Sequence, residues 1–216
     1  MAEITLWGRL SSCNVQKAVW VLEELGLPYR RIDAGGDFGG LDDPAYRAMN
    51  PHGKVPTLRD GDQVIWESDA IIRYLAARYG SGALWPADPT ERARVDQWQA
   101  WASTALYPDW IKLFWMRVRT PEAQQDAEAI EALRARCAER FTVLDRQLAG
   151  RPFVAGEALS LADIAAGTTL YRWFEMPIAR PETPEVAAWY DRLRARAPFR
   201  KAICVPFDEL WARLSF

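Results

Sequence analysis

Two hydroxyl groups and a thiol lie next to each other at the start of a predicted helix, in the stretch SSCNVQK that begins at Ser11. The helix is predicted because apolar residues recur there at the spacing of one helical face, namely Val15, Val19, Leu22 and Leu25. The N-terminal end of a helix attracts anions. A serine there can donate a hydrogen bond to an anion, whereas a cysteine can form a mixed disulfide. Ser11, Ser12 and Cys13 therefore predict a site for an anion or a sulfur, and they leave open which of them acts.

The stretch NPHGKVP, residues 50–56, contains a second group of candidate ligand-binding residues. Pro56 has no N–H donor, so we expect it near the start of an edge strand. If the bond from Val55 to Pro56 is cis, the Val55 backbone faces outward and can pair with an extended peptide. Lys54, and less directly His52, can contact a carboxylate or the backbone of such a ligand.

The stretch WESDAI contains a third group, at the start of another predicted helix. Ser68 or Asp69 can cap this helix, which leaves free N–H groups beside Glu67. This arrangement suits an anion.

The composition excludes several other kinds of site. The 216 residues include 27 basic and 29 acidic side chains, so no overall positive field attracts nucleic acid. Three widely spaced cysteines, Cys13, Cys137 and Cys204, fit neither a disulfide framework nor a metal cluster. His52 is the only histidine, which disfavours a zinc site and a Ser-His-Asp hydrolase.

The sequence shows no run of about 18 apolar residues, and its N-terminus does not resemble a secretory signal. We therefore expect a cytoplasmic protein that binds no metal, membrane or nucleic acid.

The candidate residues in the first eighty positions must be held by one sheet domain. The predicted order is β-α-β-α-β-β-α, with strands at 4–7, at 29–34 and on both sides of a turn at Asp60 and Gly61, and with helices at 15–25, 44–49 and 71–80. Such an order predicts a compact mixed sheet with helices packed on it.

A proline- and alanine-rich stretch at 81–89 predicts a linker, and residues 90–216 predict an all-helical domain. Apolar periodicity indicates helices at 90–118, 122–149, 160–174, 184–196 and 206–214. In LSLAD, Ser160 and Asp163 predict a capping box, with Leu159 as its hydrophobic staple. We interpret this box as a helix start without a chemical role.

The order of these motifs resembles that of the soluble (cytosolic) glutathione transferases. SSCNVQK, NPHGKVP, ESDAI and LSLADI lie in the right order with the right gaps, and the resemblance covers essentially the whole chain. A bacterial serine-type group with the pattern S-x-N-V-Q-K, related to the phi and theta types, is the most similar. The resemblance implies an N-terminal thioredoxin-like βαβαββα domain, residues 1–80, followed by an all-α domain, residues 90–216.

The resemblance also implies roles for the candidate residues. Glutathione is the co-substrate, and no metal is needed. The γ-glutamyl carboxylate of glutathione would bind Ser68 and the helix N-terminus, and Glu67 would bind the α-ammonium group. The other implied glutathione-binding residues are Phe38 on a glycine-rich loop, His52, Lys54, Val55 and Pro56.

Alignment of the turn before residue 15 leaves three possible catalytic residues. Counting back from GLPY places Ser12 at the position of the serine that activates the glutathione thiol, with Asn14 as a supporting neighbour. Matching Ser-Ser-Cys to the zeta type, which isomerises maleylacetoacetate, would select Ser11 instead. Cys13 would give a thiol-disulfide reductase.

The second substrate would be a small hydrophobic electrophile, bound between Leu10 and the aromatic residues Trp110 and Phe114. The resemblance further implies a homodimer. The alternatives to a transferase are a glutathione-dependent reductase or isomerase, and a non-catalytic protein of the same fold that binds glutathione or a partner.

Overall fold

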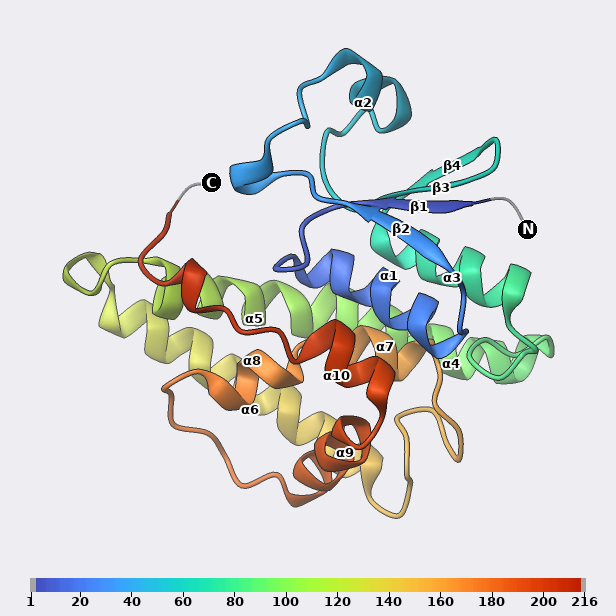
Figure 1. Ribbon diagram of the computed structural model, residues 1–216. Coiled ribbons are helices and arrows are strands. Elements are labelled where there is room, and N and C mark those ends of the chain that lie inside the picture. Colours follow the sequence, from blue (N-terminus) through green and yellow to red (C-terminus); the bar gives the residue numbers. More distant parts are fainter. Residues whose placement is uncertain (1–2, 215–216) are drawn as a thin grey trace. The chain divides into compact units, whose positions relative to one another are not determined.

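The computed structural model describes residues 3–214, which divide into two compact units (Figure 1). The first unit comprises the chain up to Gly82 together with Pro198–Val205, and the second comprises Ala83–Ala197 and Pro206–Leu214. The break after Gly82 falls within the stretch 81–89 that was expected to be a linker. The inclusion of Pro198–Val205 in the first unit was not expected from the sequence.

The first unit is built on a four-stranded mixed sheet, which confirms the predicted fold class. Its strands are β1 (Ile4–Trp7), β2 (Tyr29–Ile32), β3 (Thr57–Asp60) and β4 (Gln63–Trp66), in the order β2-β1-β3-β4. β1 pairs with β2 in parallel and with β3 in antiparallel orientation. The predicted edge position of Pro56 is wrong, because β3 is an inner strand and Pro56 lies just before it.

Helices cover both faces of this sheet. α1 (Cys13–Glu24) and α3 (Ser68–Tyr79) lie side by side on one face, and α2 (Pro44–Met49) lies on the other side (Figure 1). α1 buries the predicted apolar face, including Val15, Val19 and Leu22. α10 (Ala197–Ile203) adds Phe199, whose ring packs edge-on against Trp20 at 4.8 Å.

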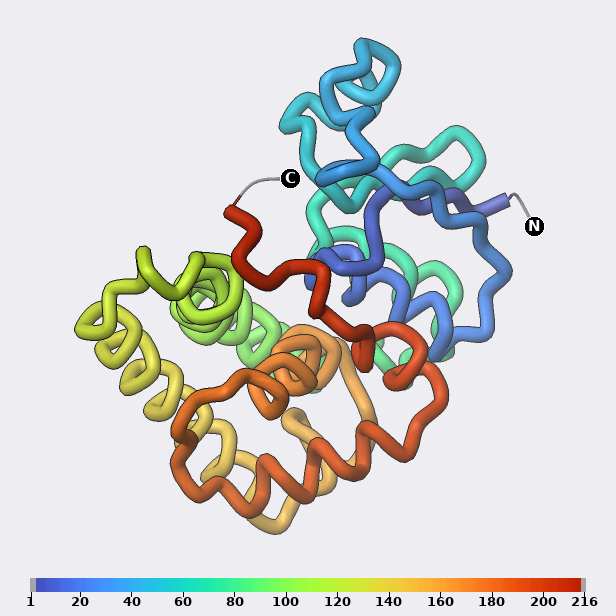
Figure 2. Tube along the Cα trace, turned by 60° about the vertical axis from the view of Figure 1, so that its left-hand side comes forward, coloured from blue at the N-terminus to red at the C-terminus, as the bar shows by residue number. Residues whose placement is uncertain are grey.

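The second unit consists of helices, as predicted. They are α4 (Pro89–Trp101), α5 (Tyr107–Phe114), α6 (Ala127–Leu148), α7 (Leu161–Gly167), α8 (Leu170–Glu175) and α9 (Pro184–Arg194). Every residue of α7 is buried, and Figure 2 shows the orange α7 segment in the middle of this unit. No helix within residues 3–214 combines the length and the apolar character needed to cross a membrane.

Two of the predicted helices are interrupted in the structure. The region 90–118 contains π-helical turns at Ala102–Leu106 and Trp115–Arg119, on either side of α5. Pro108 lies in the first turn of α5 and cannot donate a backbone hydrogen bond, which favours a break in the regular pattern there. The region 160–174 is divided at Thr168 and Thr169, whose hydroxyls donate to the carbonyls of Ile164 and Ala166.

The end of the chain differs most from the prediction. Residues 206–214 form only a 3₁₀ turn, Asp208–Leu210, instead of a helix. Phe207 and Leu210 are buried, but Trp211 and Leu214 remain about half exposed, and so short a stretch is a marginal helix by itself. The helix lies earlier, at α10, where Pro198 occupies the first turn, the position that tolerates proline.

Candidate active site

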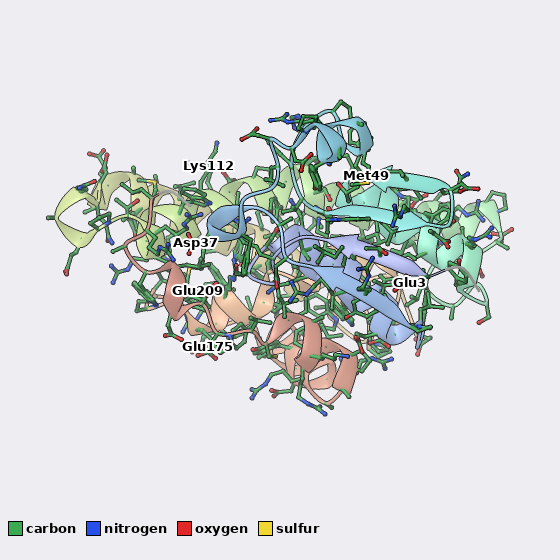
Figure 3. All side chains as sticks on the ribbon, turned by 45° about the horizontal axis from the view of Figure 1, so that its top comes forward. Glu3, Asp37, Met49, Lys112, Glu175 and Glu209 are labelled. Atoms are coloured by element: carbon green, nitrogen blue, oxygen red, sulfur yellow. The ribbon has the colours of Figure 1, made fainter. Side chains whose placement is uncertain are left out.

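A polar pocket of about 220 Å³ lies in the sheet unit, between the start of α1, the loop that ends at Pro56 and the start of α3. It is lined by Asn14, Asn50, His52, Lys54, Val55, Pro56, Glu67 and Ser68. All of these except Asn50 were predicted from the sequence as catalytic or glutathione-binding residues. Asn50 begins the NPHGKVP motif, so a polar side chain at the start of a predicted ligand loop was the available signal. In Figure 3, Met49 marks the end of α2, directly before this loop.

The turn between β1 and α1 is tied to the neighbouring strand. Gly8 N–H donates to Ile32 O at 2.8 Å, and Arg31 Nη1 donates back to Gly8 O at 2.9 Å. Gly8 has a φ of +148°, and a Cβ on it would lie 2.4 Å from Val15 Cγ2. Only glycine therefore allows this turn to approach α1 so closely.

Ser12 is the N-cap residue of α1, and its side chain makes no capping hydrogen bond. Its hydroxyl thus lies at the positive end of the helix without a bond to the N–H groups there. Cys13 is the first residue of α1 and is buried, with 3% of its surface exposed. Ser11 precedes the helix and is partly exposed.

The N-terminal ends of α1 and α3 meet at the pocket. Ser68 Oγ donates to Asn14 Oδ1 at 3.3 Å. One helical turn further along α1, Lys17 Nζ lies 3.1 Å from Asp69 Oδ1, and the Lys17 side chain is almost fully buried. These two contacts hold two positive helix ends beside one cavity.

Glu67 is the N-cap residue of α3, so the prediction that Ser68 or Asp69 occupies this position is wrong. Glu67 has a φ of +70°, which is uncommon for a residue with a side chain and costs free energy. Its side chain makes no capping hydrogen bond. The chain turns sharply here because β4 ends at Trp66 and α3 begins at Ser68. This turn places both Glu67 and Ser68 in the pocket wall.

The loop before β3 contains a cis peptide bond between Val55 and Pro56. The Lys54 carbonyl in the same loop accepts hydrogen bonds from Tyr46 Oη at 2.7 Å and from Asn50 Nδ2 at 2.8 Å. Asn50 Oδ1 accepts a bond from the backbone N–H of His52 at 3.0 Å. The side chains of Tyr46, in α2, and of Asn50, directly after α2, therefore hold this loop by hydrogen bonds.

The remaining predicted residues, including the catalytic candidates Ser11, Ser12 and Cys13, are not among those that line this pocket. Phe38 lies in a 3₁₀ turn, Gly36–Phe38, and is 59% exposed; Asp37 beside it is labelled in Figure 3. Leu10 lies in the turn after β1 of the sheet unit. Trp110 and Phe114 lie in α5 of the helical unit, where their rings stack at 5.9 Å and are buried.

The predicted capping box is present at the start of α7, where Asp163 Oδ2 accepts bonds from Ser160 N and Ser160 Oγ. Asp163 Oδ1 accepts two more, from Val154 N at 2.9 Å and Trp189 Nε1 at 3.1 Å. Burial raises the pKa of Asp163 to about 6, against the opposing effect of these hydrogen bonds. In the part of the chain that the structure describes, no group of three His, Cys, Asp or Glu side chains could hold a metal ion.

A mixed sheet of this order with a cis-proline loop, followed by a separate helical unit, defines a class of two-unit proteins built on the thioredoxin-like fold. The chain belongs to the glutathione S-transferase family: the model of its N-terminal domain matches residues 6–83 and that of its C-terminal domain matches residues 106–197.

Relatives match over nearly the whole length of the chain. Glutathione S-transferase GstB of Escherichia coli K12 is 40% identical over 94% of this chain and 99% of its own length. Glutathione S-transferase 3 of Zea mays is 31% identical, with 94% of each chain covered. A theta class glutathione S-transferase of Xanthomonas axonopodis pv. citri, solved with glutathione bound, matches with a TM-score of 0.90 and 48% identity, covering 95% of this chain and 99% of that one.

Proposed function

We propose that this protein is a glutathione transferase, which binds glutathione in the polar pocket and activates its thiol as a thiolate for attack on small hydrophobic electrophiles. The observation that carries the proposal is the meeting of the α1 and α3 N-termini at that pocket, with Asn14 and Ser68 in contact at 3.3 Å. Two positive helix ends suit a ligand with a carboxylate and a developing thiolate. No metal takes part in this reaction.

The pocket wall offers a partner for each polar part of glutathione. The γ-glutamyl carboxylate binds Ser68 and the N-terminus of α3, and Glu67 accepts hydrogen bonds from the α-ammonium group. The Val55 backbone pairs with the backbone of the ligand in the manner of an added strand. Lys54 and His52, both exposed at the rim, bind the glycine end.

Ser12 activates the thiol by donating a hydrogen bond to the sulfur. A free thiol has a pKa of about 8.5, and lowering it by roughly two units requires about 2.7 kcal/mol of preference for the thiolate. One charge-assisted hydrogen bond together with a helix N-terminus can supply this energy. Burial of Cys13 within the first turn of α1 disfavours it as the reacting thiol, and this supports Ser12 as the acting residue.

The second substrate is a small hydrophobic electrophile, for which Leu10 of the sheet unit is a predicted contact; Trp110 and Phe114 are 0% and 1% exposed and pack inside the helical unit. Phe38 contributes to glutathione binding from its exposed loop. The protein acts in the cytoplasm as a homodimer, in keeping with the family to which it belongs.

The direct test is turnover of a chlorinated dinitrobenzene with glutathione, followed by the absorbance of the conjugate. We expect saturable dependence on glutathione and no reaction with glutathione omitted. Saturable binding of glutathione without turnover of a panel of electrophiles would instead identify a non-catalytic binding protein. A mass increase of one glutathione on the intact protein, absent in Cys13→Ser, would identify a reductase.

A further inference from the structure

Three buried side chains, of Tyr46, Asn50 and Thr57, are hydrogen-bonded to one another or to the backbone of the loop at residues 50–56, which we call the pocket loop. Tyr46 Oη and Asn50 Nδ2 both donate to the Lys54 carbonyl, and each also lies within 3.0 Å of Thr57 Oγ1. Their exposed fractions are 5% for Tyr46, 2% for Asn50 and 0% for Thr57. We call these three residues the loop anchor. Of them only Asn50 lines the pocket, so Tyr46 and Thr57 belong to the interior.

The loop anchor fixes the orientation of one peptide group. In a trans peptide the C=O and N–H bonds point in opposite directions. Because the Lys54 carbonyl points inward to Tyr46 and Asn50, the N–H of Val55 points away from the loop anchor. Val55 lines the pocket, and within residues 3–214 its N–H has no hydrogen-bond partner. A ligand carbonyl can supply that partner.

We propose that Tyr46, Asn50 and Thr57 are positioning residues for glutathione, which hold the Lys54 carbonyl inward and thereby present the Val55 N–H to a peptide carbonyl of the ligand. The proposal rests on the proposed function, because it names the residues that prepare the same pocket for its substrate. The loop anchor acts on binding and not on the sulfur, since none of its members belongs to the turn that contains Ser12.

The chemistry of the loop anchor suits this role. Burial raises the pKa of Tyr46, so its hydroxyl stays protonated and remains a donor at any working pH. Asn50 uses its amide nitrogen for Lys54 and Thr57 and its oxygen for the backbone N–H of His52, so the loop is held at two points by one side chain.

The test compares two tyrosine variants of the full chain. Tyr46→Phe removes only the hydroxyl and both of its contacts in the loop anchor. The matched control is Tyr29→Phe in the same unit, which removes a hydroxyl that donates to Glu23 Oε1 at 2.8 Å, away from the pocket. We expect Tyr46→Phe to raise KM for glutathione about fivefold to tenfold, with kcat at saturating glutathione within about twofold of wild type. Tyr29→Phe should leave both values unchanged.

A second pair of variants keeps the test decisive if Tyr46→Phe folds poorly. Thr57→Val removes the hydroxyl at nearly constant volume, and Thr57→Ser retains it. We expect the Kd for glutathione, measured by titration calorimetry, to rise in Thr57→Val and to remain within about twofold of wild type in Thr57→Ser.

Two results would overturn the inference while leaving the proposed function intact. The first is a folded Tyr46→Phe protein whose KM for glutathione equals that of wild type. The second is a loss of stability in both tyrosine variants with no change in KM, which would make the loop anchor purely structural. Failure of the wild-type protein to bind glutathione at all would overturn the proposed function, and the inference with it.

Discussion

Two serines, Ser12 and Ser160, occupy N-cap positions in the described part of the chain, and their side chains differ in their hydrogen bonds. Ser160 begins α7 in the helical unit, and its hydroxyl and backbone N–H are both bound by Asp163. Ser12 begins α1 in the sheet unit, and its side chain makes no capping bond. The contrast extends to other helices: Asp88 caps α4 and Asp126 caps α6, whereas the side chain of the N-cap residue of α3 caps nothing.

This difference indicates which helix N-termini can bind a ligand. The N-terminal N–H groups of every helix need partners. Where the chain supplies a side chain, as at α7, the helix end is closed and contributes only stability. Where the N-cap side chain stays uncommitted, as at Ser12 and Glu67, the helix end can receive an anion and the residue itself is available for a ligand. Ser12 and Glu67 are the N-cap residues of the two helices whose N-terminal ends meet at the pocket.

The capping box at the start of α7 should contribute more to the free energy of unfolding than an ordinary exposed cap. Asp163→Ala removes a fully buried carboxylate and leaves the donors of Ser160, Val154 and Trp189 without an acceptor. We expect a loss of about 3–5 kcal/mol in the free energy of unfolding, measured by denaturant titration. The control Asp126→Ala removes an exposed cap of α6 and should cost about 1 kcal/mol. Equal losses in the two variants would refute the view that the buried carboxylate of Asp163 stabilises its helix start more than an exposed cap does.

At the start of α1, loss of the Ser12 hydroxyl should lower activity and leave stability almost unchanged, which is the opposite of the result expected for Asp163. Ser12→Ala is expected to lower kcat/KM about a hundredfold to a thousandfold, because it removes the hydroxyl that we propose as the donor to the developing thiolate. The free energy of unfolding should stay within about 0.5 kcal/mol of wild type, since no cap bond is lost. The control Ser11→Ala should keep nearly full activity. Retained activity in Ser12→Ala would contradict the catalytic assignment.

The buried carboxylate of the capping box should also make stability depend on pH. The pKa of Asp163 is about 6 in the folded protein, against 3.8 for the free side chain. A raised folded pKa means that the folded state binds more protons, so the stabilising contribution is complete below the unfolded pKa and is lost as pH rises through the folded one. We expect the free energy of unfolding to decrease between about pH 4 and pH 6 by roughly 3 kcal/mol from this residue.

Denaturant titrations of wild type and Asp163→Asn at several pH values isolate this contribution, because all other groups are shared. The difference between the two proteins should change across that interval and be flat above it. A constant difference from acid to neutral pH would show that Asp163 does not titrate in this range.

The contact between α1 and α3 should matter for both stability and binding. Lys17→Met removes a buried ammonium group 3.1 Å from Asp69, and we expect a loss of about 2 kcal/mol together with a higher KM for glutathione. The control Lys201→Met removes an exposed lysine, 64% exposed, that pairs with Glu23 in the same unit. It should cost at most about 1 kcal/mol and leave KM unchanged. Equal effects of the two variants would show that burial of the pair is unimportant.

Much of this architecture was predictable from local sequence. The apolar period of residues 15–25 and the capping box at Ser160 each depend on a few neighbouring residues, and the structure contains both. The predicted hairpin is also present, but its turn residues are Gly61 and Asp62, because Asp60 ends β3 and pairs with Gln63. The thioredoxin-like unit followed by helices was confirmed because the motifs lie in a fixed order along the chain. Seven of the residues that were predicted to act in catalysis or glutathione binding line one pocket for the same reason.

The sequence by itself determined which segments become strands and helices and which residues offer chemistry, because periodicity, turn residues and caps act over a few positions. Tertiary structure alone decided that Glu67 occupies the N-cap position of α3 with a positive φ, that α10 forms at 197–203, and that Tyr46 and Asn50 both donate to the Lys54 carbonyl. These features depend on contacts between segments distant in sequence or on burial. The hydroxyl of Ser160 became structural and that of Ser12 remained available for a local reason: Asp163 lies three residues after Ser160, whereas Val15 lies three residues after Ser12.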